Sequence, residues 1–227
     1  MKKTIMAAIL FIIVFIVVLV LKFPYAEYME KAVKDLNSGN DIKISWKNSE
    51  NKYLKLELKN VTVNSKQGEI LKLDDFIITA QIFGGFKFRG KGVENLSVSG
   101  NIKNGKIKFS IEEYPLPSYI ASMTGDGKFK FIGDYDIKKK SGKIDFNGVI
   151  KKIPNPIITE PAAIAGEAEI NGNETSVDFE AKGKTIAGAG KVNIKGSQIA
   201  GNIKIDTGII PVNVKISGEL NNIKIKL

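Results

Sequence analysis

One uninterrupted apolar run near the start of the chain constrains its fold more than any other feature. Residues 5–21 contain no charged residue, glycine or proline. As a helix the run would be roughly 26 Å long, close to the hydrocarbon thickness of a bilayer. It also lacks the polar face that a helix packed on a soluble domain shows. The run predicts a transmembrane anchor over residues 1–22, with apolar positions that include Ile5, Ile9, Phe11, Phe15, Leu19 and Leu21.

The residues that flank this run predict its orientation. Lys2 and Lys3 precede it, and an excess of lysine and arginine marks the side that stays in the cytoplasm. We therefore expect a single-pass inner-membrane protein with a cytoplasmic N-terminus and a periplasmic body. The alternative is a cleaved signal peptide. The run ends in Phe23, Pro24 and Tyr25 without the small-x-small site that cleavage requires, which favours an anchor.

The residue types that the chain lacks exclude several classes of chemistry. The sequence contains no cysteine and no histidine, so it can have neither a disulfide nor a thiolate metal site, and it lacks the usual general base. Asp126, Asp134 and Asp136 lack the glycine and the closing glutamate of a calcium loop. We predict a protein that is not an enzyme and has no catalytic residues, no cofactor and no metal site.

The charge is strongly basic and comes almost entirely from lysine. The net charge is +10, and Arg89 is the only arginine. Readers of nucleic acid favour arginine because its planar fork pairs with guanine and phosphate, so we expect no nucleic-acid partner. Two explanations of the lysine excess stay open: a compositional bias of the source genome, and attraction to anionic lipid head groups.

A short amphipathic helix is predicted directly after the anchor, over residues 23–40. Pro24 can open it, and apolar residues recur every three or four positions from Tyr25 to Leu36. The helix ends near Gly39. Its apolar face either packs on the following domain or lies in the membrane interface.

From Asp41 onward the apolar period changes from about 3.6 to 2, which predicts β-strands with one dry and one wet face. We expect an elongated antiparallel sheet, curved or sandwich-like, in two continuous blocks over residues 41–152 and 162–227. A bulge is expected at Asn60, and the Asn104-Gly105 pair predicts a tight hairpin. Pro115 and Pro117 are expected to interrupt the sheet.

Three aromatic residues are the candidate contacts for a partner or a groove in the β region. They are Trp46, Phe76 and Phe83. The alternative for all three is ordinary packing, since large aromatic side chains dominate protein cores as well as interfaces.

The order of these parts resembles the type II secretion system protein N (GspN) family. The resemblance rests on the lysine-flanked anchor, the Phe23-Pro24-Tyr25 juncture, the sequences LELKNVTV at 56–63 and GEILKL at 68–73, the turn at 115–117, and a Gly-x-apolar-x-apolar finish. The chain is also similar to the wider AsmA group of envelope proteins, which have an N-terminal anchor and repeated strands. Neither resemblance implies a catalytic residue.

The first resemblance implies a non-catalytic, membrane-anchored periplasmic component of type II secretion that binds other secretion proteins. The AsmA-like alternative implies a protein that handles lipid or maintains the envelope, with an apolar β groove. An open, continuous apolar face would favour lipid, and a closed, filled core would favour a protein scaffold. An envelope hydrolase is a third hypothesis, and it requires a cleft with two convergent carboxylates.

Overall fold

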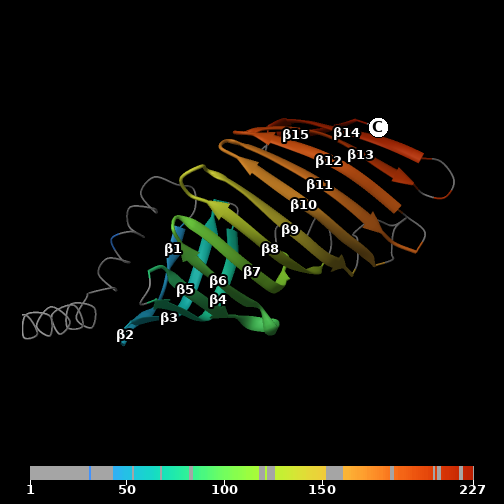
Figure 1. Cartoon of the computed structure of the whole chain (residues 1–227). Helices are drawn as coiled ribbons and strands as arrows, with labels where there is room; N and C mark the ends of the chain where they lie inside the picture. The colour runs from blue at the N-terminus through green and yellow to red at the C-terminus, as the bar shows by residue number, and fades with distance from the viewer. Residues whose placement is uncertain are drawn as a thin grey trace, which may run out of the picture.

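The structure, a computed structural model, describes residues 31, 43–52, 54–66, 68–81, 84–117, 121, 126–151, 161–184, 187–206, 208, 211–219 and 222–226. This part of the chain forms one antiparallel sheet of 15 strands (Figure 1). The prediction of a mainly β protein is confirmed. The predicted anchor, and the juxtamembrane helix apart from Lys31, lie outside the described residues. Within the described residues, no helix is long and apolar enough to span a membrane.

The strands follow one another in space almost as they do in the sequence. From β3 onward each strand pairs with the next, while β1 and β2 both pair with β3. The strands are β1 (Lys43–Ser45), β2 (Asn48–Lys52), β3 (Lys55–Ser65), β4 (Gly68–Ala80), β5 (Phe86–Lys91), β6 (Ser97–Lys103), β7 (Lys106–Pro115), β8 (Gly127–Asp136), β9 (Ser141–Ile150), β10 (Ala162–Asn171), β11 (Glu174–Lys182), β12 (Ala187–Lys195), β13 (Gln198–Asp206), β14 (Pro211–Glu219) and β15 (Asn222–Lys226). A 3-10 turn, η1 (Val93–Asn95), joins β5 to β6.

The register keeps the apolar side chains of successive strands on one face of the sheet. For example, Ile111 in β7 pairs with Phe131 in β8, which pairs with Phe146 in β9. Because side chains alternate along a strand, aligned apolar positions give one apolar and one polar face. The described residues form one sheet of alternating strands. The predicted antiparallel sheet is therefore a single layer of strands.

The N-terminal part of the sheet contains a filled core. In Figure 1, β3 to β6 curl under β7 and β8, while the later strands spread into a broad twisted layer. The curl encloses a buried cluster, and Leu73 is its least exposed member at 2%. The buried members of this cluster are Leu56, Leu58, Val61, Leu73, Leu96 and Val98. Phe129 and Ile150 are the remaining buried hydrophobic side chains of the described chain.

Local irregularities lie close to where the sequence placed them. Asn104 and Gly105 have φ of 53° and 76°, the positive values that a type I′ turn needs, so the hairpin is confirmed. Asn60 has φ 52°, but β3 and β4 stay in the same register from Lys59 to Val61, and the register shift lies between Val63 and Asn64. The bulge expected at Asn60 is therefore found three to four residues farther along β3.

The strand ends at the prolines as expected, but Pro115 itself still belongs to the ladder. β7 runs to Pro115, which pairs with Lys128, and the amide of Leu116 still donates to the carbonyl of Gly127. Proline is tolerated because it is the last residue of the strand, where the hydrogen bond that its missing N–H would donate is not needed. A bulge between Ile111 and Tyr114, with φ 53° at Glu113, restores the apolar register.

The strands on either side of residues 152–160 pair directly. β9 and β10 are in register from Ser141 opposite Asn171 to Ile150 opposite Ala162. The hydrogen-bonded ladder therefore continues from the first predicted block into the second.

Candidate functional site: an open apolar sheet face

The apolar side of β10 to β14 is an extended half-buried surface, and we call it the open face. Every one of its positions is half-buried, and none of the described residues from 161 to 219 is buried. The open face consists of Ala162, Ile164, Gly166, Ala168, Ile170, Thr175, Val177, Phe179, Ala181, Gly188, Gly190, Val192, Ile194, Ile199, Gly201, Ile203, Ile205, Val212, Val214, Ile216 and Gly218.

The half-burial follows from the single-layer architecture. Within the described chain, β10 to β14 pack chiefly against their immediate neighbours in the sheet. Cross-strand neighbours cover the flanks of each side chain but leave its end uncovered. The side chains of the open face are therefore only half-buried, because a single layer of strands covers them on their flanks alone.

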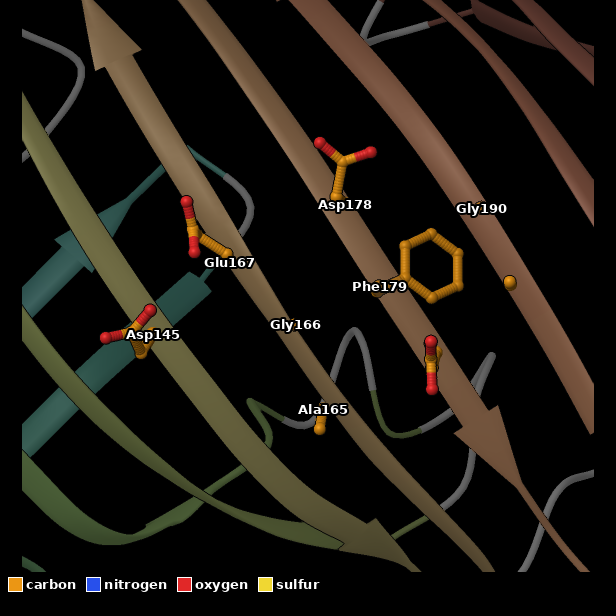
Figure 2. Close-up of a pocket in the computed structure, with 9 residues that line it drawn as sticks. Asp145, Ala165, Gly166, Glu167, Asp178, Phe179 and Gly190 are labelled. Atoms are coloured by element: carbon orange, nitrogen blue, oxygen red, sulfur yellow. The ribbon is translucent and has the colours of Figure 1, made fainter.

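Glycines opposite aromatic rings shape the open face locally. Phe179 pairs with Gly166 on one side and Gly190 on the other, and Figure 2 shows its ring reaching toward Gly190. A Cβ atom at Gly166 would lie 2.6 Å from the Phe146 ring and 2.8 Å from Cβ of Phe179. An aromatic ring thus occupies the space that a side chain at the glycine would need. The surface therefore has raised positions at the aromatic rings and shallow depressions at the glycines.

The opposite face of the same strands is polar and exposed, with ion pairs between neighbouring strands. Lys191 Nζ lies 3.0 Å from Asp178 Oδ2 and Lys195 Nζ lies 2.6 Å from Glu174 Oε1. The hydrogen bond from Lys195 lowers the pKa of Glu174, and the same bond raises the pKa of Lys195. These pairs are solvent-exposed, so each contributes little to stability, but they mark this face as the wet one.

A shallow acidic hollow lies on the polar face. Carboxylates surround two small side chains, Ala165 and Ala189; they are Asp145, Glu167, Asp178 and Glu180. Figure 2 shows Asp145, Glu167 and Asp178 on three neighbouring strands. Glu167 and Asp178 already pair with Lys143 and Lys191. Among the described residues no group of carboxylates could hold a metal ion.

The sequence-predicted contact residues lie elsewhere. Trp46 and Phe76 are half-buried and pack against the buried cluster around Leu73, and the ring of Phe76 lies 6.0 Å from that of Phe88. Both belong to the filled core and not to the open face. Phe83, the anchor positions and the Phe23-Pro24-Tyr25 juncture lie outside the described residues.

The open face was not among the predicted site residues, although its signal is present in the sequence. From Ala162 onward, glycine, alanine and short branched residues occupy the inward positions of each strand. Such small side chains cannot build a thick core by themselves. Comparison with protein-family models, curated proteins and solved structures finds no significant match to the chain.

Proposed function

We propose that this protein is a non-catalytic, lipid-handling component of the cell envelope, and that the open face holds the acyl chains of lipids. The single observation that carries the proposal is the continuous set of half-buried apolar positions across β10 to β14. The proposal keeps the expected arrangement of an N-terminal membrane anchor and a periplasmic β body.

The dimensions of the open face suit an acyl chain. Five strands span about 24 Å at 4.8 Å per strand, and nine residues span about 30 Å along each strand. The projected area of roughly 700 Å² exceeds the largest apolar patch of a typical monomer, about 300–600 Å². One leaflet of the hydrocarbon core is about 15 Å thick, half of the bilayer value, so a whole acyl chain fits on the face.

The composition of the open face favours lipid over a protein partner. Phe179 is its one aromatic residue, and Thr175 is its one side chain with a hydrogen-bonding group. Cores of protein interfaces are enriched in tyrosine, tryptophan, methionine and arginine, which supply anchoring contacts. Acyl chains need only a continuous apolar surface, and glycine and alanine depressions provide one without directional contacts.

Photo-crosslinking of two neighbouring positions tests the proposal. A benzophenone amino acid replaces Ile203, on the open face, or Asn202, the matched control on the polar face of the same strand. In the full chain, expressed in cells whose lipids carry radioactive phosphate, light should attach labelled lipid at position 203 and not at 202. Absence of lipid at 203, or equal labelling at both positions, would contradict the proposal.

A type II secretion component is the second candidate function. The observation that favours it is the filled core of β3 to β6, which is typical of a scaffold that binds through its outer surface and strand edges. The same experiment separates the two candidates. Crosslinks from position 202, on the outer polar face, to a secretion-system protein identified by mass spectrometry, with no lipid adduct at position 203, would favour the scaffold.

A further inference from the structure

Two neighbouring hairpin tips form a concentrated basic edge, which we call the lysine tip. The turn between β6 and β7 contributes Lys103 and Lys106, and the turn between β8 and β9 contributes Lys138, Lys139 and Lys140. All five side chains are exposed. The amide of Ile137 donates to the carbonyl of Gly105 over 2.8 Å, so the two tips are joined.

The charge of the lysine tip is not neutralised by ion pairs. Within the described part of the chain, no carboxylate lies within ion-pair distance of these five ammonium groups. The nearby carboxylate, Asp136, accepts the backbone amides of Lys138 and Lys139 at 3.0 Å. Those amide bonds, together with the charges of Lys139 and Lys106, lower the pKa of Asp136, so its one negative charge offsets only part of the five positive charges. A positive potential therefore remains at this edge.

The opposite edge of the same strands differs in this respect. There Lys128 lies 3.4 Å from Glu113 and 3.7 Å from Glu94, and Lys130 lies 3.0 Å from Glu112. These two lysines of that edge have acidic partners, whereas the five lysines of the lysine tip have none among the described residues.

An exposed apolar side chain, Ile137, lies within the lysine tip, directly after the end of β8. Ile137 is 48% exposed, and it follows Tyr135, which pairs with Ile107 on the apolar face of the sheet. Lysines around an exposed aliphatic side chain, with a tyrosine just behind, are the elements that bind an anionic bilayer surface. Lysine without arginine favours this partner over nucleic acid.

We infer that the lysine tip docks on an anionic bilayer surface and is the end of the sheet at which lipid reaches the apolar face. The inference deepens the proposed function and rests on it for the role of lipid entry. The lysines attract phosphate head groups, and Ile137 enters the upper acyl region. Tyr135 then marks the start of the apolar surface that leads along the strands.

Site-specific fluorescence on the full chain tests the docking. Because the chain contains no cysteine, a single Ile137→Cys variant can carry one environment-sensitive dye. Val93→Cys is the matched control, since Val93 is 51% exposed at the opposite edge. The labelled chain is reconstituted in phosphatidylcholine vesicles with and without phosphatidylglycerol. The dye at 137 should shift to the blue with phosphatidylglycerol and be quenched by brominated acyl chains, and the dye at 93 should not.

Charge removal gives the second arm. Replacing Lys138, Lys139 and Lys140 together by glutamine should weaken the affinity of the labelled tip for anionic vesicles on the order of a hundredfold. Added salt should weaken the affinity of the tip that keeps its lysines. A dye at 137 that ignores phosphatidylglycerol, or that responds to a DNA duplex and not to vesicles, would overturn the inference. If lipid still crosslinks at position 203 in that case, the proposed function stands without this entry route.

Discussion

Leu73 in β4 and Ile203 in β13 lie on the same face of one sheet, yet Leu73 is 2% exposed and Ile203 is only half-buried. The two regions share the alternation of apolar and polar residues. They differ in curvature and in side-chain volume: leucine, phenylalanine and tryptophan fill the curl of β3 to β6, and glycine and alanine are frequent on β10 to β14. Alternation orients side chains toward one face, but enclosure needs curvature and bulk as well.

The largest expected effect contrasts truncations in the two regions. Leu73→Ala should reduce the free energy of unfolding by about 2–5 kcal/mol, because it leaves a cavity in a filled core. Ile203→Ala should cost about 1 kcal/mol or less, because the side chain is only partly removed from water. Chemical denaturation of the full chain checks both, with Trp46 fluorescence for the core and circular dichroism for the whole sheet. Equal losses would show that the open face is covered in solution.

An intermediate effect concerns the glycines of the open face. In Gly166→Ala the new Cβ would lie 2.4 Å from the carbonyl oxygen of Asp178 and 2.6 Å from the Phe146 ring. Overpacking of this kind should cost about 1–3 kcal/mol. Gly188→Ala is the control, because its Cβ would meet only the carbonyl oxygen of Lys204, at 3.3 Å.

We expect Gly188→Ala to change the unfolding free energy by about 0.5 kcal/mol or less. Thermal denaturation of both variants provides the measurement. If the two variants behave alike, the close packing of rings over glycine is not what orders the open face.

The smallest expected effect is a pH dependence of the polar face. The hydrogen bond from Lys195 lowers the pKa of Glu174 in the folded protein, so the unfolded chain binds the proton more readily. The stabilisation is then present above the ordinary glutamate pKa and is lost as the pH falls through the lowered value. The urea midpoint of the unmodified chain should fall slightly more than that of Glu174→Gln between neutral and acidic pH. A larger fall in the variant would contradict the sign.

The sequence predicted the strands and turns of this fold better than it predicted which side chains are buried. Alternation identified the strands, and the Asn104-Gly105 pair identified its hairpin, because both depend on neighbouring residues alone. The prolines end β7 as expected, but Pro115 itself stays in the ladder, because the penalty of proline depends on its place in the strand. Trp46 and Phe76 were predicted either as contacts for a partner or groove or as packing residues, and curvature, which no local pattern encodes, packs them against the filled core.

The open face was missed for a related reason. An inward isoleucine such as Ile203 has the same sequence pattern whether a second layer covers it or not. Only the long-range arrangement of strands distinguishes the two cases. The signal that could have separated them is the change at Ala162 to glycine and alanine at inward positions, which leaves too little volume to fill a core.

The pairing of each strand with its successor has a consequence for how the protein is made. From β3 onward, a new strand needs only the hairpin partner that precedes it in the chain, so loop closure is short at every step. The sheet can then assemble from its first strands onward while later strands are still being synthesised, without waiting for the C-terminus. Insertion or loss of one hairpin would change the length of the ribbon and leave the earlier strands intact, as in repeat proteins.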